Sequence, residues 1–343
     1  MGLDDFVALQ SEYPKPKYLP SLAANDPIVQ AITNKCGAGQ VLSFHLLDKR
    51  WNGNYIMRYA TSDGDLFVKL NHEENKSVFV AEAVGLTSLL KSGAVRAPKP
   101  LHVGEIHGGE DGRGSFLITE FLELSPFGSM TTTNQRILGE QIARLHTSGN
   151  LDDIHKGRFG FMVNNFHSRT PLDNTWSSTW VEFFTRRLTS QLGMLQKEQV
   201  SRSCYTRSCY MMSSDFNQTF VSLLSRVIDQ LPHDFNKLAI TPSLLHGDLW
   251  IGNAGATTDG PVLFDPACFF GHSEFDLAIM KIFGGFSDEF FQAYYEILPQ
   301  EEGFEQRERY YLLYNYLNQL NLFGDEKVLV KCISVMQEIL QGD

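Results

Sequence analysis

The N-terminal part of the chain alternates apolar and polar residues in a way that is typical of a small antiparallel sheet. Residues 41–47 and 55–59 have strand-like composition on either side of a polar loop, residues 48–54. A third strand-like run, residues 66–70, follows an Asp-Gly turn. The first forty residues are proline-rich and weakly periodic, which predicts an arm that leads into a short helix near residues 28–33.

A helix and a buried strand follow this predicted sheet. Residues 79–90 carry apolar side chains at helical spacing, with Glu82 in the first predicted turn and Ser92-Gly93 at the end. Residues 115–121 read as a buried strand that runs into a polar linker, the natural break between two lobes. We therefore expect an arm with a short helix at 1–40, a sheet-containing lobe at 41–122 and a larger lobe at 123–343.

The rest of the chain is dominated by amphipathic helical patterns. Helices are expected at residues 135–146, 180–196, 216–231, 275–283, 288–297, 307–322 and 326–340. Aromatic residues crowd the last four of them, and most should pack in the core. The sequence thus predicts the α+β class, with a small N-terminal antiparallel sheet plus helix and a larger, mainly helical C-terminal lobe.

Composition narrows the classes of function. A chain of 343 residues with 43% apolar side chains can bury a large core. Its 29 basic and 40 acidic residues give a net charge of −11, which argues against nucleic acid as a partner. Five cysteines without a metal-like cluster indicate reduced intracellular thiols, and the acidic first thirty residues do not resemble a targeting signal. No apolar run approaches the roughly twenty residues of a membrane span, so we expect a cytoplasmic location.

The strongest chemical signal is the run from His246 to Asn253, followed by an acidic residue in an apolar stretch. Asp248 precedes Asn253 by five residues, and Asp265 ends the run Val-Leu-Phe-Asp. A kinase-type fold uses these residue types for phosphoryl transfer. There, an Asp accepts the proton of the attacking hydroxyl, while an Asn oxygen and a second carboxylate hold magnesium ions. The pattern therefore predicts a reaction, a nucleotide and a metal.

A pair of charged residues in the N-terminal lobe supports the same chemistry. Lys69 lies on a predicted strand, from which an ammonium group can reach the α and β phosphates of a nucleotide. Glu82 follows on the next helix and is placed to pair with it. Either residue alone would be read as a solvated surface charge. Their order relative to Asp248, Asn253 and Asp265 favours the functional interpretation.

Two neighbours of Asp248 have competing interpretations. His246 is expected to be structural, since a histidine in such a loop usually packs and hydrogen-bonds the backbone. Trp250 suits the mouth of an acceptor site, where its flat amphipathic ring could lie on a sugar face. Core packing remains the alternative for Trp250.

Several segments together resemble one known family. They are residues 245–253, 265–278, 283–286, 316–324, 67–69 and 82–86, with Trp176 and Trp180. The chain resembles the fructosamine kinase (ketosamine-3-kinase) family, a branch of the aminoglycoside and choline phosphotransferase group with the protein-kinase-like fold. The resemblance spans residues 50 to 325, and the Trp after His-Gly-Asp and the segment after Asp265 are the features most particular to this branch.

The resemblance implies a reaction and its partners. Members of the family use ATP to phosphorylate the sugar 3-hydroxyl of ketosamines, including fructosamines on lysines of glycated proteins. The 3-phosphate is unstable and its decomposition frees the amine, so the biological outcome is deglycation, a form of protein repair. Ketosamine small molecules and glycated proteins are the expected partners, with no nucleic acid and no membrane.

The resemblance also assigns roles by matching position. Asp248 would be the catalytic base, with Asn253 and Asp265 as magnesium ligands. ATP would be bound by Lys69, Glu82, Gly53, Asn54, Glu120, Phe121 and Leu122, the last three in the linker that faces adenine. The acceptor would be bound by Trp250, His272, Glu274, Trp180 and Asn318, each of which also has a packing alternative.

The chain departs from the family in the loop expected to cover the phosphates. Where the family has three glycines and a cysteine, this sequence has Lys49, Arg50, Trp51 and Asn52, and Gly53 is the only nearby glycine. Backbone amides must approach phosphates closely, so bulky residues could weaken ATP binding or reshape the loop. The resemblance links that cysteine to redox-sensitive, disulfide-linked dimers, and with Asn52 in its place such a switch is not expected.

Two alternatives stay open at this point. The altered loop motivates a catalytically weak pseudokinase that binds nucleotide or ketosamine. A kinase for another small hydroxyl acceptor, of the aminoglycoside or choline type, is the other alternative. The sequence does not decide between monomer and homodimer, or between free and protein-bound ketosamines.

Overall fold

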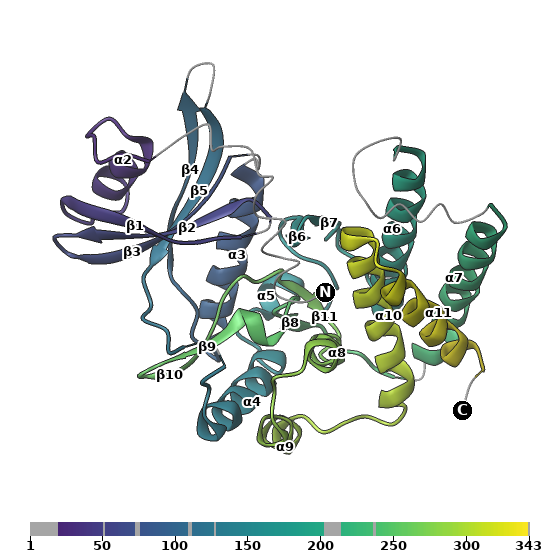
Figure 1. Ribbon diagram of the computed structural model, residues 1–343. Helices are drawn as coiled ribbons and strands as arrows, with labels where there is room; N and C mark the ends of the chain where they lie inside the picture. Colours follow the sequence, from purple (N-terminus) through teal and green to yellow (C-terminus); the bar gives the residue numbers. More distant parts are fainter. Residues whose placement is uncertain are drawn as a thin grey trace. The chain divides into compact units, whose positions relative to one another are not determined.

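The computed structural model describes residues 20–50, 52–72, 76–108, 112–126, 128–201, 214–235 and 238–341 (Figure 1). Most of the predicted N-terminal arm, up to residue 19, and Trp51 lie outside this part of the chain. The chain divides into two compact units. One consists of Met1–Thr87 and Pro98–Glu123, and the other of Ser88–Ala97 and Leu124–Asp343.

Five strands form one antiparallel sheet in the first unit. They are β1 (Val41–Lys49), β2 (Asn54–Thr61), β3 (Gly64–Asn71), β4 (Pro100–Gly108) and β5 (Gly112–Glu120), in the order β1-β2-β3-β5-β4. The strands expected at 41–47, 55–59, 66–70 and 115–121 are thereby confirmed. The sequence did not predict β4, because it is an edge strand whose alternation is disturbed by Gly104 and by a register shift between Pro100 and His102.

One helix precedes the strands of this sheet, and another lies between β3 and β4. α2 (Pro27–Asn34) is capped by Asp26, whose carboxylate accepts hydrogen bonds from the first backbone N–H groups of the helix. α3 (Lys76–Ser92) contains the helix expected at 79–90. Because α3 begins at Lys76, Glu82 lies in its second turn, and its prediction in the first turn was wrong.

The sheet presents different faces to α2 and α3. Successive strand residues point to opposite faces. Val68 and Leu70 belong to the buried apolar cluster that includes the apolar residues of α2. Lys69, which lies between them, instead pairs with Glu82 of α3. The alternation therefore places the Lys69 ammonium on the α3 side and the main apolar cluster on the α2 side.

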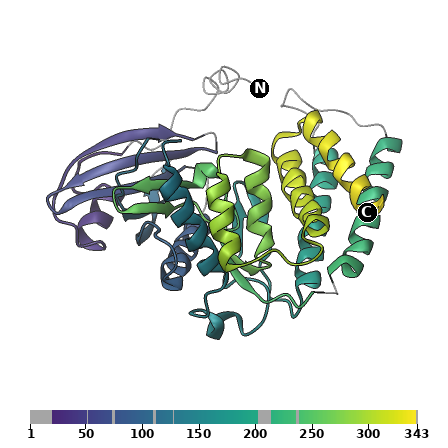
Figure 2. The same ribbon diagram turned by 90° about the horizontal axis from the view of Figure 1, so that it is seen from below.

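The second unit is mainly helical. Its helices are α4 (Thr132–His146), α5 (Asp152–His155), α6 (Trp180–Ser201), α7 (Ser214–Phe235), α8 (Glu274–Phe283), α9 (Asp288–Ile297), α10 (Phe304–Phe323) and α11 (Glu326–Gln341). All seven helices predicted for this part are confirmed, whereas the one-turn α5 was missed. Helix α4 packs along α9, and α6, α7, α10 and α11 lie side by side as a group (Figure 2). Tyr310, Tyr311 and Tyr314 of α10 are buried, as expected.

Short two-stranded ladders and one turn of 3-10 helix connect these helices. The ladders pair β6 (Asn165–His167) with β7 (Thr170–Leu172), β8 (Ser243–Leu245) with β11 (Phe269–Gly271), and β9 (Ala254–Thr257) with β10 (Gly260–Leu263). The 3-10 turn, η2, covers Ile251–Asn253. Within the described residues, no helix is both long enough and apolar enough to cross a bilayer. The β8 and β9–β10 segments carry the motif residues, so these ladders position the candidate site.

Candidate active site

The turn that follows β8 is held by a buried carboxylate. Asp276 of α8 is fully buried and accepts hydrogen bonds from the backbone N–H of His246 at 2.7 Å and of Gly247 at 2.9 Å. Its Oδ2 also lies 3.3 Å from Nε2 of the buried His146. Asp276 and His146 therefore fix the backbone from which Asp248 projects, a role that the sequence analysis did not assign to either residue.

His246 is structural and uncharged. Its Nδ1 accepts a hydrogen bond from the Asp248 N–H at 3.3 Å, so Nε2 carries the proton and donates to the Phe264 carbonyl at 3.1 Å. Desolvation lowers the pKa of His246 and outweighs the opposing influence of Asp276 and Asp248. The expectation of a packed, backbone-bonded histidine is confirmed.

Two side chains hold the carboxylate of Asp248. Asn253 Nδ2 donates to Asp248 Oδ2 at 3.1 Å and to the Asp248 carbonyl at 2.9 Å. On the other oxygen, Oδ1, His167 Nε2 lies at 3.0 Å. The Asp248 side chain is still 17% exposed, so a substrate hydroxyl can reach it. His167 belongs to no motif, and the sequence carried no signal for this contact.

Asn253 and Asp265 provide a donor set that fits a magnesium ion. The amide nitrogen of Asn253 donates to Asp248, so the amide oxygen is the atom of this side chain that could face a metal. Asp265 follows β10 and has φ 56°, a left-handed backbone that is rare for residues other than glycine and is often found at functional sites. Carboxylate and amide oxygens are the hard ligands that magnesium prefers.

Lys69 and Glu82 form the predicted ion pair in the first unit. Lys69 Nζ lies 2.6 Å from Glu82 Oε1, and the two side chains are only 5% and 15% exposed. Removing one partner of such a pair leaves an uncompensated buried charge. The ammonium of Lys69 is thus fixed in direction.

The segment that replaces the family's glycine-rich loop is a tight hairpin turn between β1 and β2. Gly53 has φ 86°, and its N–H donates to the Arg50 carbonyl at 3.0 Å. Asn71 Nδ2 of β3 donates to Asn54 Oδ1 at 2.7 Å, and the Asn54 N–H donates to Asn52 Oδ1 at 3.2 Å. These hydrogen bonds involve the described residues on either side of Trp51, and Gly53 is the one left-handed position among them.

The residues expected to face adenine leave the end of β5. Glu120 Oε1 accepts a hydrogen bond from the Lys99 N–H at 2.7 Å. The Arg58 guanidinium lies over the Phe121 ring, 4.7 Å from its centroid. Leu122 is partly exposed and comes just before the last residue of the first unit, Glu123. Their role toward ATP stays a prediction.

Trp250 lies two residues after Asp248 in the sequence, and its indole ring packs against neighbouring residues. A Cβ at Gly252 would lie 2.1 Å from the Trp250 ring, so only glycine leaves room for the indole there. The ring of Phe283 packs against it, with centroids 5.3 Å apart. The indole remains partly exposed, and both interpretations of Trp250 are compatible with this position.

Trp180 and Asn318 are deeply buried. Trp180 is 2% exposed, stacks on Phe184 with centroids 5.2 Å apart and donates from Nε1 to the Tyr311 hydroxyl at 3.1 Å. Asn318 is also 2% exposed, and its Oδ1 has no hydrogen-bond partner within the described residues. For Trp180, these contacts favour the packing alternative over contact with an acceptor.

His272 and Glu274 are not brought together with Asp248. Because β8 and β11 are antiparallel, Gly271 pairs with Ser243 at the end where β8 begins, whereas Asp248 follows the other end. His272 and Glu274 line a separate cavity of about 310 Å³. Other residues that line it are His146, Tyr294, Pro299 and Phe304. Both oxygens of Glu274 are bound by Arg307, at 2.6 and 2.9 Å.

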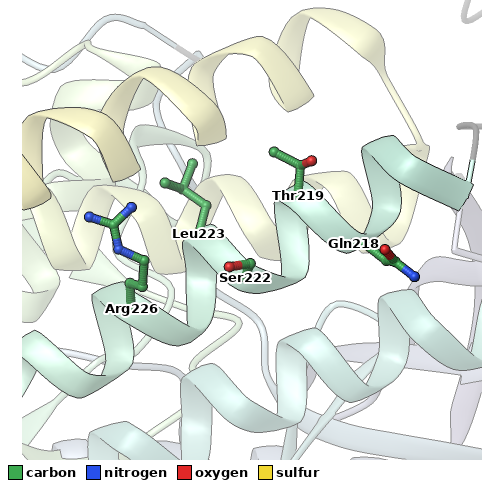
Figure 3. A pocket seen from close by; sticks show the side chains of 5 residues that line it. All are labelled: Gln218, Thr219, Ser222, Leu223 and Arg226. Carbon is green, nitrogen blue, oxygen red and sulfur yellow. The ribbon is translucent and has the colours of Figure 1, made fainter.

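Another depression follows the surface of α7. It is lined by Gln218, Thr219, Ser222, Leu223 and Arg226, all from this one helix (Figure 3). None of these residues belongs to the candidate site. The depression therefore adds nothing to the chemistry around Asp248.

Comparison with known proteins shows the family to which the chain belongs. The model of the fructosamine kinase family matches residues 50–342, which is most of the chain. The chain belongs to the fructosamine kinase family. It is 35% identical to the chloroplastic protein-ribulosamine 3-kinase of Arabidopsis thaliana over 321 residues, covering 93% of this chain and 89% of that protein. It is 37% identical to the ketosamine-3-kinase of Mus musculus over 287 residues, covering 78% and 85%.

Solved structures of other proteins share the fold of this member of the fructosamine kinase family. A putative fructosamine-3-kinase from Thermobifida fusca has a TM-score of 0.72 at 27% identity and covers 92% of this chain and 99% of its own. The aminoglycoside phosphotransferase APH(4)-Ia, solved with ADP and hygromycin B, has a TM-score of 0.59 at 12% identity over 90% and 98%. The protein-kinase-like α+β fold expected from the sequence is confirmed.

Proposed function

We propose that this protein transfers the γ-phosphoryl group of ATP to the 3-hydroxyl of ketosamines, including fructosamines on lysines of glycated proteins. Membership of the fructosamine kinase family supports the choice of acceptor. The observation that carries the chemistry is the Asp248 carboxylate, which is oriented through both of its oxygens yet remains accessible. Decomposition of the 3-phosphate would free the amine, so the proposed outcome is deglycation.

The residues proposed to accept the proton belong to the second unit, and those proposed to bind the phosphates belong to the first. In the second unit, Asp248 accepts the proton of the attacking sugar hydroxyl as the new oxygen–phosphorus bond forms and the bond to ADP breaks. In the first unit, Lys69, directed by Glu82, binds the α and β phosphates. Positioning and charge stabilisation supply most of the catalysis in such reactions.

Asn253 and Asp265 would hold magnesium. The metal would supply positive charge that neutralises the phosphate oxygens. Trp250 is the acceptor-side residue that we favour, because it is partly exposed next to Asp248 and its indole suits a sugar face. We also keep the cytoplasmic location as a proposal. The described cysteines Cys36, Cys268 and Cys332 are thiols, and burial raises the pKa of Cys332 to about 12, which makes it unreactive.

The proposal is tested by incubating the purified protein with magnesium, ATP and a synthetic fructosamine, and by identifying the 3-phosphate by mass spectrometry. Asp248→Asn should lower kcat by at least about 100-fold, because the amide cannot accept the proton. Asp259→Asn is the matched control, since this exposed Asp lies in the turn between β9 and β10 and should tolerate the same change.

Two outcomes would contradict the proposal. Absence of product from the wild-type protein would exclude ketosamines as acceptors, and choline and aminoglycosides would then be compared under the same conditions. Equal product from Asp248→Asn and the wild type would exclude Asp248 as the base.

A further inference from the structure

A histidine outside every recognised motif contacts the proposed base. His167 Nε2 lies 3.0 Å from Asp248 Oδ1, and the His167 side chain is only 9% exposed. The other oxygen, Oδ2, accepts from Asn253 Nδ2 at 3.1 Å. Each carboxylate oxygen of Asp248 therefore has one neighbouring nitrogen, and the carboxylate cannot rotate without losing both contacts.

The surroundings of His167 indicate which of its nitrogens carries the proton. An ionised carboxylate only accepts hydrogen bonds, so Nε2 must donate to Asp248 Oδ1. Nδ1 of His167 is buried and has no hydrogen-bond partner within the described residues. A proton on Nδ1 would leave a buried donor unsatisfied, which is costly. The neutral tautomer with hydrogen on Nε2 fits the site best.

The strand that carries His167 is anchored through Asn165. Asn165 of the same strand donates from Nδ2 to the Cys268 carbonyl at 2.8 Å, and its Oδ1 accepts from Asn174 Nδ2 at 2.7 Å. The β6–β7 turn that follows has Ser168 in the left-handed region, at φ 57°. The hairpin thus holds the imidazole at a defined place relative to β11 and Asp248.

We propose that His167 is a positioning residue for phosphoryl transfer, which orients the Asp248 carboxylate through Oδ1 toward the acceptor hydroxyl. This inference rests on the proposed role of Asp248 as base. His167 keeps its Nε2 proton throughout, and the proton of the acceptor goes to Asp248. Asn253 likewise orients the carboxylate, through its hydrogen bond to Oδ2. The two side chains together determine which lone pairs of Asp248 remain for the acceptor hydroxyl.

Steady-state kinetics test this role with two substitutions. His167→Leu removes the donor and should lower kcat by about 10- to 100-fold, since small misplacements of a catalytic group cost about that much, while KM for ATP changes less than about twofold. His167→Gln keeps an N–H group at nearly the place of Nε2 and should recover most of kcat. Unchanged kcat in His167→Leu, or equal losses in the two variants, would overturn the proposal.

His155 offers a matched control in the same unit. Its Nε2 lies 3.0 Å from Asp152 Oδ1, so it forms a similar histidine–aspartate pair, and the residues that it contacts lie outside the candidate site. His155→Leu should lower the thermal unfolding temperature but leave kcat nearly unchanged. If both Leu variants lost kcat equally, the effect would be a general loss of structure and the proposal would be wrong.

A spectroscopic measurement separates this inference from the proposed function. In protein labelled with ¹⁵N-histidine, His167 should show a proton on Nε2 and none on Nδ1, and its Nε2 signal should shift in Asp248→Asn. A proton on Nδ1 would overturn the contact. If the wild type phosphorylated no ketosamine while the Nε2–H signal was present, the acceptor assignment would fail and the His167–Asp248 contact would stand.

Discussion

At the scale of single residues, two buried imidazoles of the second unit resist protonation. Burial lowers the pKa of His246, and burial followed by the charge of Arg307 lowers that of His272 from 6.5 to about 3. His272 Nδ1 lies 2.6 Å from the Tyr311 hydroxyl, which the neutral ring can satisfy. Both histidines are therefore uncharged in the folded protein near neutral pH.

His272 should make the protein sensitive to acid. Below about pH 6.5 the unfolded chain binds a proton at His272 that the folded protein does not bind until near pH 3, so stability falls as the pH drops through this window. The loss for one such group between pH 6.5 and 5 is at most about 2 kcal/mol. In His272→Gln, urea unfolding at several pH values should show a correspondingly shallower decline.

The control for this measurement is His45→Gln. The His45 side chain is exposed on β1, so the same substitution there should leave the decline of the unfolding free energy as in the wild type. Equal slopes for wild type and His272→Gln would show that His272 contributes nothing to acid sensitivity.

Residues that form a motif along the chain could be predicted, whereas contacts made only in the folded structure could not. Asp248, Asn253 and Asp265 could be identified because their spacing along the chain is the signal itself. The contact between His167 and Asp248 depends on where the β6–β7 hairpin docks, and three-residue strands leave no periodicity to detect. His272 and Glu274 follow Asp265 closely in sequence, yet the antiparallel ladder carries them to its other end.

At the scale of elements, the connection between β1 and β2 is where the sequence predicts a departure from the family. Gly53 and Asn54 in this connection donate backbone hydrogen bonds to Arg50 and Asn52. The positions of the strands could be predicted from the sequence. The hydrogen bond to Asn54 could not, because its donor is Asn71 of β3.

Replacing Lys49, Arg50 and Trp51 together by glycine tests the effect of this departure on nucleotide binding. ATP affinity, measured by calorimetry, should fall by up to about 100-fold, since the three glycines together add roughly 1.5–3 kcal/mol of conformational entropy cost. Asp63→Gly is the control, because its turn joins β2 and β3 at the opposite end of the same ladder. Strong tightening in the triple variant would instead show that the native turn impairs nucleotide binding.

At the scale of the whole molecule, the residues proposed to bind nucleotide and the proposed base belong to different units. Lys69 and Glu82 belong to the first unit, and Asp248 belongs to the second. The α+β class and the long helices were predictable from composition and periodicity alone. The short ladders that carry the site were not, since strands of three or four residues are fixed by tertiary packing.

Magnesium with ATP should stabilise the folded protein as a whole. At about 100 times the dissociation constant, a ligand that binds only the folded state adds roughly 2.7 kcal/mol, visible as a higher unfolding temperature in calorimetry. Lys69→Met should lose most of this gain, because the methionine cannot bind phosphate. Lys35→Met, which removes an exposed lysine of the same unit, should keep it. Full stabilisation of Lys69→Met by ATP would contradict the role of Lys69.

The left-handed backbone of Asp265 has a consequence for how this enzyme could decay during evolution. Asparagine tolerates positive φ better than most residues and has almost the same shape as aspartate. Asp265→Asn would therefore preserve the fold while it removes one negative charge from the proposed metal site. Among descendants of this chain, a well-folded protein with asparagine at this position would be the expected form of a kinase that has become a binding protein.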